Sequence, residues 1–256
     1  GLTLNGTGIS SGGALINSSS TGATYAGLVT LGSSTSIVGD AGTIALSNAG
    51  TLSGSGFDLT LGGAAGGSIA SIIGTGTGTV TKTGAGTWTL TAANTYTGAT
   101  TISDGKLALS GSGSIADSSG VVSSNDGVLN IAGTTSGATI KTLSGSSGAS
   151  TGVVLGSKTL TLSNASGTYG GVIGGTGGGL TLSAGTQTLT GANTYTGATT
   201  VGGGTLQAGS ATAFGSGVIT VASGAVLDLN GQTMTSMGGL TLNGTGISSG
   251  GALINS

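Results

Sequence analysis

The chain has 256 residues and a formal net charge of −2, and Gly, Ser and Thr make up 141 of its residues. Arg, Glu, His, Cys and Pro are absent, so the charge is carried by four Lys and six Asp. These absences exclude a Ser-His-Asp triad, a thiol nucleophile and an ordinary zinc site. They also deprive a nucleic-acid surface of its main source of affinity, and no apolar run is long enough for a membrane-spanning helix.

The first segment of the chain recurs near its other end. Residues 1–18 read GLTLNGTGISSGGALINS, and residues 239–256 repeat all 18 positions at an offset of 238. Chance does not produce such a match, and self-similarity at a fixed period indicates a tandem array. We therefore predict one continuous unit over residues 1–256: a block of about 238 residues (1–238) followed by the start of the next block (239–256).

Short runs of alternating apolar and polar residues follow along the whole chain. The alternation is clear at Thr87–Thr91, Lys106–Leu109 and Ala225–Leu229. This period predicts strands with one buried face, and the Gly, Asn, Asp and Ser between the runs supply turns. A disordered Gly- and Ser-rich linker would have no reason to keep such a rhythm. We predict an all-β chain with essentially no α-helix.

Three all-β architectures suit short strands with frequent turns: a sandwich, a propeller and a solenoid. Aromatic residues are only 3% of the chain, which is too few for the wide core of a sandwich. Leu, Ile, Val and Ala suit a narrow continuous core, and an open solenoid can re-enter its own start whereas a closed propeller cannot. The absence of Pro fits strands that have a neighbour on both edges. These features favour a β-solenoid.

One stretch has a specific resemblance. Residues 82–115 read KTGAGTWTLTAANTYTGATTISDGKLALSGSGSI, which resembles the autotransporter-associated β-strand repeat, also called the passenger-associated transport repeat. The usual form of that repeat is K-T-G-x-G-T-L-x-L-x-G-x-N-x-Y-x-G-x-T, followed by G-x-L. A second copy over residues 180–209 matches from Leu189 onward but lacks the K-T-G opening. The looser strand segments between such repeats are similar to residues 40–61, 170–178 and 216–230.

This resemblance implies a right-handed parallel β-helix. Proteins with this repeat are exported by Gram-negative bacteria as passengers of very large surface proteins, most of which are adhesins or surface fibres. The expected location is therefore extracellular, at the cell surface. The motif brings no catalytic residue with it and says little about a ligand.

The stretch Asn-Thr-Tyr-Thr-Gly occurs twice, 99 residues apart, and supplies the main candidate positions. In one interpretation its Tyr and Asn form a glycan-binding surface. In the other, Asn bonds to local backbone at a corner while Tyr covers the adjacent turn, and we favour this structural role. The positions concerned are Asn94, Tyr96, Gly98, Asn193, Tyr195 and Gly197.

Two further aromatic residues are candidates for an exposed contact. Trp88 and Tyr25 could stack on sugar rings, although a single Trp at a patterned strand position more often packs inside. Runs such as Thr75/Thr77/Thr79 raise the possibility of ice binding, which needs the same Thr on one face at a constant spacing. Because the runs are bunched and irregular in sequence, we expect outward Thr to serve simply as strand formers.

The acidic residues offer little chemistry. Calcium-binding β-rolls use dense G-G-x-G-x-D nonapeptides, and the six Asp here are isolated. A hydrolase needs two carboxylates facing one cleft, yet the nearest pair is Asp117 and Asp126. The Gly-rich stretches lack the following helix and Lys of a phosphate loop. We therefore expect no metal, no cofactor and no enzyme activity.

The leading functional prediction is a structural block of a long extracellular fibre or stalk, which builds a coat, sheath or matrix or serves as a spacer. The alternative is an adhesin whose lateral face binds glycans or a partner chain. An exposed row of Tyr and Asn would favour the adhesin, whereas a plain Thr and Ser face would favour the fibre. The expected partner is the chain itself, through tandem blocks or through end-to-end or lateral association, because unpaired strand edges invite pairing.

Overall fold

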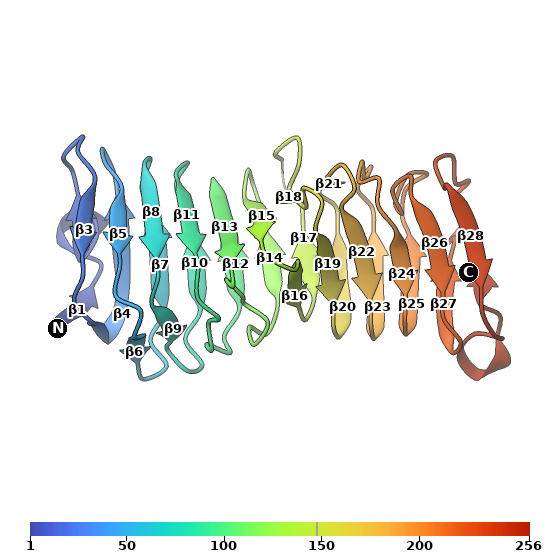
Figure 1. Ribbon diagram of the computed structural model, residues 1–256, viewed down its shortest axis with the longest axis horizontal. Coiled ribbons are helices and arrows are strands. Elements are labelled where there is room, and N and C mark those ends of the chain that lie inside the picture. The colour runs from blue at the N-terminus through green and yellow to red at the C-terminus, as the bar shows by residue number, and fades with distance from the viewer. Residues whose placement is uncertain (147) are drawn as a thin grey trace.

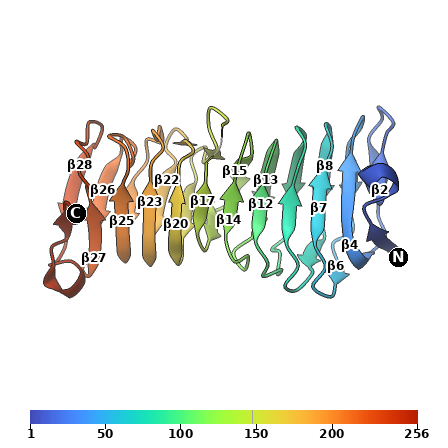
Figure 2. The ribbon, with the colours of Figure 1, turned by 180° about the vertical axis from the view of Figure 1, so that it is seen from behind.

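The computed structural model describes residues 1–146 and 148–256. Its strands pair in parallel into three sheets of 15, 8 and 6 strands that run along a rod of about 11 turns. Figure 1 shows this rod with the N- and C-termini at opposite ends, and the same layers are seen from behind in Figure 2. The predicted all-β parallel solenoid is confirmed.

The strands, in chain order within each sheet, are as follows. The 15-stranded sheet contains β1 (Leu2–Gly6), β2 (Leu15–Asn17), β4 (Val29–Gly39), β6 (Thr51–Gly54), β7 (Leu59–Gly62), β9 (Ile72–Gly74), β10 (Val80–Lys82), β12 (Thr100–Ile102), β14 (Val121–Ser123), β17 (Leu143–Gly145), β20 (Ala165–Tyr169), β23 (Gly185–Leu189), β25 (Gly204–Ala208), β27 (Ala225–Asp228) and β29 (Leu253–Ile254). The eight-stranded sheet contains β3 (Ala23–Tyr25), β5 (Ile44–Leu46), β8 (Gly66–Ile69), β11 (Thr87–Leu90), β13 (Lys106–Gly111), β15 (Val128–Thr134), β18 (Val153–Val154) and β21 (Ile173–Gly174). The six-stranded sheet contains β16 (Ala138–Ile140), β19 (Thr159–Leu162), β22 (Gly179–Leu182), β24 (Thr199–Val201), β26 (Val218–Val221) and β28 (Gly239–Leu242).

The chain winds past three sides in a fixed order. From β16 onward each turn passes from the six-stranded sheet to the 15-stranded sheet, and β17 leads on to β18 in the eight-stranded sheet. Side-chain hydrogen bonds between neighbouring turns join residues 20 to 24 apart over most of the rod. A turn therefore takes about that many residues, and its length varies along the chain.

The core consists of inward columns in which one side chain lies over the next. One column contains Ile44, Gly67, Trp88, Leu107 and Leu129, which are aligned in the register of β5, β8, β11, β13 and β15. Gly67 has no side chain, and the other four residues of the column are at most 3% exposed. Each turn thus buries its apolar residues against the turns before and after it, which is how solenoids obtain stability.

Among residues 1–146 and 148–256, helical structure is confined to two short 3-10 segments, Ile9–Ser11 and Ile247–Ser249. The described part of the chain contains no α-helix, as predicted. Within that part, no helix has the length and apolar character needed to cross a membrane.

Candidate functional surface

Asn94 is buried and connects three successive turns of the solenoid. Its Oδ1 accepts a hydrogen bond from the backbone N–H of Ile73 at 2.8 Å, and its Nδ2 donates to the carbonyl oxygens of Ala92 and Ser114 at 3.0 and 2.9 Å. Only the bond to Ala92 is local. The other two bonds reach backbone groups of the turns on either side, at a buried corner where polar groups need partners. The Ser114 carbonyl also accepts from the backbone N–H of Asn94 at 3.0 Å.

Asn193 has the same role in the second copy. Its Oδ1 accepts from the N–H of Ile173 at 2.8 Å, and its Nδ2 donates to the carbonyl of Ala213. The side chains of Asn94 and Asn193 are 3% and 5% exposed. Neither is available to a ligand at the surface.

The two motif tyrosines lie inside the rod. Tyr96 and Tyr195 are fully buried, and each hydroxyl shares a hydrogen bond of 2.7 Å with a buried threonine four residues later, Thr100 or Thr199. Burial raises the pKa of both hydroxyls well above the usual value, against a smaller opposite effect of the threonine bond. The tyrosines therefore fill the core and do not cover the outside of a neighbouring turn.

Gly98 and Gly197 lie where one turn passes very close to the previous one. A Cβ at Gly98 would collide with the carbonyl oxygen of Gly78, and a Cβ at Gly197 would collide with that of Gly178. The Gly197 N–H donates to the Gly178 carbonyl at 2.9 Å. Glycine is needed here because backbone contacts backbone.

The prediction of an exposed aromatic contact at Trp88 is wrong. Trp88 is fully buried, and its Nε1–H donates to the carbonyl of Gly62 at 2.9 Å. Gly67 faces it in the preceding turn, and a Cβ there would lie 3.0 Å from the Trp88 ring. A glycine in one turn thus provides the volume that the indole of the next turn fills. Tyr25, in the terminal strand β3, is partly buried and packs against the core.

The two copies of the motif face different sides of the rod. β11, which carries Trp88, lies in the eight-stranded sheet, whereas the equivalent β23 lies in the 15-stranded sheet. The next strands shift in the same way, from β12 in the 15-stranded sheet to β24 in the six-stranded sheet. The offset of 99 residues is not a whole number of turns. The repeated Asn and Tyr therefore form no row along any one face.

Lys82 is an inward-facing cation. It lies between Leu61 and Ile102 in the register of β7, β10 and β12 and is fully buried. Its Nζ donates to the carbonyl oxygens of Thr83, Gly84 and Asp104 at 2.7, 2.6 and 3.1 Å. Burial lowers the pKa of Lys82 from 10.5 to about 8, although the charge of Asp104 acts in the opposite direction. In the second copy of the motif, β22 corresponds to β10, and its last residue is the apolar Leu182 in place of a lysine.

This lysine gives a testable pH dependence. Between pH 8 and 10 the unfolded chain keeps the Lys82 proton while the folded chain has released it. Because the unfolded state then binds more protons, stability rises with pH. We expect the melting temperature of the wild type, relative to Lys82→Met, to be flat below pH 7 and to rise from pH 8 to 10. Calorimetry at a series of pH values measures this difference.

The control for this experiment is Ile102→Met, which replaces a neighbour of Lys82 in the register of β10 and β12 without removing an ionisable group. Its difference from the wild type should not change with pH over the same range. The series stops at pH 10 because burial raises the pKa of Tyr169 to about 12, so ionisation of this tyrosine destabilises the fold above pH 10. A Lys82 difference that does not rise between pH 8 and 10 would contradict the buried-cation interpretation.

Threonine is regularly spaced on one face, contrary to the expectation from the sequence. Every strand of the six-stranded sheet places one Thr at its outward central position, and the strand register aligns all six. These residues are partly or fully exposed, and in β19, β22 and β26 they stand between buried apolar neighbours. The Thr row, as we call it, consists of Thr139, Thr161, Thr181, Thr200, Thr220 and Thr241.

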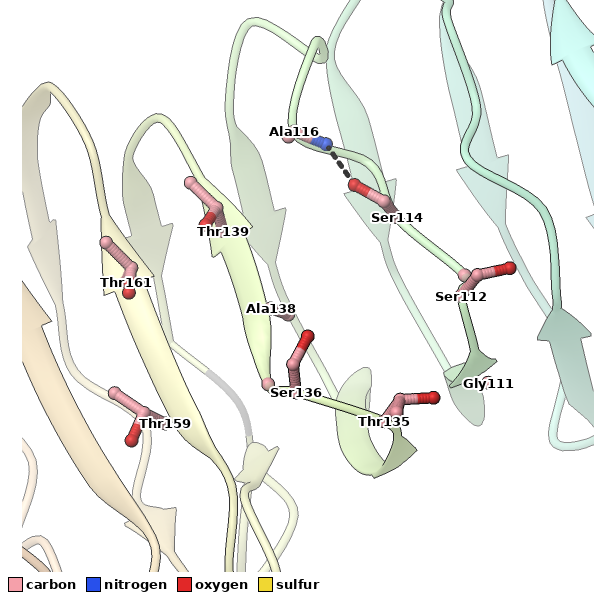
Figure 3. A pocket seen from close by; sticks show the side chains of 12 residues that line it. Gly111, Ser112, Ser114, Ala116, Thr135, Ser136, Ala138, Thr139, Thr159 and Thr161 are labelled. Carbon is pink, nitrogen blue, oxygen red and sulfur yellow. Dashed lines mark hydrogen bonds between the residues drawn. The ribbon is translucent and has the colours of Figure 1, made fainter.

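A groove of about 530 Å³ adjoins the start of the Thr row, where the six-stranded sheet begins. β16 pairs with β19 on one side only, and the turn before it carries the irregular segment 112–116. Figure 3 shows hydroxyl-bearing side chains around the groove, with Ser114 accepting from the backbone N–H of Ala116 at 3.2 Å. The groove is lined by Gly111, Ser112, Gly113, Ser114, Ala116, Thr135, Ser136, Gly137, Ala138, Thr139, Thr159 and Thr161.

The groove is uncharged, since neither an acidic nor a basic side chain lines it. Sequence reasoning missed both the groove and the Thr row, because both depend on which residues of different turns lie side by side. Among the described residues no three His, Cys, Asp or Glu side chains gather in a way that could hold a metal ion. The surface therefore offers hydroxyl groups and small apolar groups.

The chain is thus a parallel solenoid whose repeated motif residues join one turn to the next. Residues 80–109 and 182–208 match the family model described as passenger-associated-transport-repeat. The chain therefore carries two copies of this repeat, and the resemblance seen in the sequence is confirmed. Repeat and fold are of a structural passenger type, not one typical of enzymes. No curated protein and no solved structure matches the chain.

Proposed function

We propose that the chain is a block of an extracellular surface rod that serves as a fibre, coat element or spacer. The observation that carries this proposal is the plain lateral surface. The conspicuous motif side chains are buried, and the regular face presents the Thr row with no charged residue among its members. The passenger-type repeat supports export to the cell surface.

The two identical 18-residue segments support a tandem arrangement. Residues 1–18 pair with the turn that follows them, and residues 239–256 pair with the turn that precedes them. One such segment could therefore hold both neighbours at once, so that the core continues from block to block. β2 and its counterpart β29 both lie in the 15-stranded sheet, so this part of the segment keeps its side of the rod from block to block.

Electron microscopy of filaments sheared from cells that make the protein tests this function. At about 4.8 Å between turns, the 11 turns of one block predict an axial period of roughly 50 Å. Averaged filaments with that period, decorated by antibodies against this chain, would support the rod. Antibody label confined to the cell interior, or found only on compact particles, would contradict it.

The adhesin remains the second candidate because the groove lies at one end of the Thr row. A neutral glycan could place its hydroxyl groups against Thr139 and Thr161, which belong to both features. Binding of the chain to an array of neutral glycans tests this role. Thr139→Val should abolish any binding at the groove, whereas the matched outward substitution Thr101→Val in β12 should leave it intact.

A further inference from the structure

The groove beside the Thr row is a gap between two successive turns in the middle of the chain. At one end of the gap the Thr135 N–H donates to the Gly111 carbonyl at 2.9 Å, and at the other end Lys141 Nζ donates to the Asp117 carbonyl at 2.8 Å. Between these two points, in the described part of the chain, no hydrogen bond joins β16 to the segment 112–116. The two turns thus separate and rejoin, with the groove of about 530 Å³ between them (Figure 3).

One wall of the groove is the free edge of β16. The Ser163 N–H donates to the Ile140 carbonyl at 2.9 Å. Because alternate residues of a strand bond to the same side, Ala138 and Ile140 are the residues of β16 that bond to β19. The N–H and the carbonyl of Thr139 therefore point into the groove. β16 contains neither the charge nor the Pro that commonly protects an edge strand.

The opposite wall is the segment around Ser114, which is paired with the turn before it. The Ser114 N–H donates to the Ala92 carbonyl at 3.1 Å, and the Ser114 carbonyl accepts from the Asn94 N–H at 3.0 Å. The N–H and C=O of one trans peptide group point in opposite directions, so the Gly113 carbonyl and the Ile115 N–H point into the groove. Both residues are buried, where backbone groups normally have partners.

These four backbone groups form one pattern. Within the residues that the structure describes, none of the four has a hydrogen-bond partner. A strand that lies in the groove parallel to β16 has two successive peptide groups that bridge both walls. The first accepts from the Thr139 N–H and donates to the Gly113 carbonyl, and the second donates to the Thr139 carbonyl and accepts from the Ile115 N–H. An extended segment of three residues thus satisfies all four groups, which favours a peptide over a glycan as the occupant.

We propose that the groove binds an extended, uncharged peptide segment of a partner protein by strand addition to β16. In this mode of recognition, backbone hydrogen bonds give affinity and the pockets for side chains give specificity. The segment is uncharged because neither an acidic nor a basic side chain lines the groove, and a charge placed there would lose hydration without compensation. The proposal goes beyond the rod function and does not depend on it.

The residues around the groove restrict the side chains of the bound segment. Its central residue is aligned with the exposed Thr139, so Ser or Thr fits there beside the Thr row. The residue before it lies between Gly113 and Ala138, which leaves room for a small side chain. The residue after it lies between Ile115 and Ile140, each 1% exposed, whose burial leaves no room for a side chain. The expected sequence is therefore Ala or Gly, then Ser or Thr, then Gly.

An NMR titration of the isotope-labelled chain with the uncharged peptide acetyl-Gly-Ala-Thr-Gly-Ser-amide tests the proposal. The amide signals of Thr139 and Ile115 should shift, and the exchange of both amides with solvent should slow, because each N–H gains a carbonyl partner. The matched control peptide carries an N-methyl group on its Thr, which removes the N–H that donates to the Gly113 carbonyl. We expect it to bind at least about tenfold more weakly.

Two variants of Thr139 separate backbone pairing from side-chain contact. Thr139→Pro removes the N–H that faces the groove but no bond to β19, and Pro is tolerated at the edge of a sheet. Peptide binding should be lost in this variant while circular dichroism shows the fold retained. Thr139→Val removes only the hydroxyl group and should bind the peptide as the wild type does.

Three results would overturn the proposal: no shift of the Thr139 and Ile115 signals up to the solubility limit of the peptide, equal binding of the N-methylated peptide, or equal loss of binding in Thr139→Val and Thr139→Pro. A neutral glycan that binds the wild type and Thr139→Pro but not Thr139→Val would assign the groove to the glycan instead. Each of these results leaves the rod function standing, because the axial period of the filaments does not depend on the groove.

Discussion

Replacing Trp88 by alanine is expected to lower the free energy of unfolding by about 3–5 kcal/mol, the usual cost of removing a large buried aromatic side chain. Trp88 is fully buried, and its Nε1–H is the donor to the Gly62 carbonyl. The cavity cannot be filled from the preceding turn, because a Cβ at Gly67 would collide with the Ile44 carbonyl. Denaturant unfolding followed by circular dichroism measures the loss.

Trp88→Leu is the control for cavity size. The usual form of the repeat has Leu at this place, and Leu lies directly above it in the column at Leu107. We expect Trp88→Leu to lose less than Trp88→Ala, since it keeps part of the buried apolar volume. A loss below about 1 kcal/mol for Trp88→Ala, which is typical of surface substitutions, would show that the indole is not a core element.

Removing the two motif asparagines together is expected to have the second large effect. Asn94→Ala leaves the buried Ile73 N–H without its acceptor and the Ser114 carbonyl without one donor. An unsatisfied buried group costs about 1–3 kcal/mol, and Asn193→Ala should cost a similar amount at Ile173. The two sites lie in separate turns and share no partner, so their effects should add to about 2–6 kcal/mol.

The matched control is Asn5→Ala, an exposed asparagine at the start of the rod, which should change stability by no more than about 0.5 kcal/mol. Hydrogen exchange adds a local measurement. The amide of Ile73 should lose protection in Asn94→Ala but not in Asn193→Ala, since exchange reports local opening. Equal behaviour of Asn5→Ala and Asn94→Ala would contradict the role of Asn94 as a connection between turns.

Several features were accessible from local sequence because they depend on local chemistry. The alternation at Thr87–Thr91 predicted a strand, which β11 confirms over Thr87–Leu90. The shortage of aromatic residues correctly favoured a narrow core over a sandwich. The motif around Asn94 correctly predicted the repeat family. Each of these inferences needs only a residue and its near neighbours along the chain.

Other features depended on residues about 20 positions away. The sequence favoured packing for Trp88 but left an exposed contact open, because nothing near it reveals that Gly67 leaves room for its ring. It also predicted irregular threonines, because Thr139 and Thr161 are aligned only when the length of the intervening turn is known. The bonds from Asn94 to both neighbouring turns could not be inferred for the same reason.

The sequence by itself determined the strand content, the solenoid class, the repeat family and the identity of residues 1–18 with residues 239–256. The tertiary structure alone decided which side of the rod each element faces. The physical reason is that most inter-turn hydrogen bonds of side chains span 20 to 24 residues and this number varies, so the angular position of a motif depends on every turn before it. An offset of 99 residues therefore places two equal motifs on different sheets, while an offset of 238 returns β29 to the same sheet as its counterpart β2.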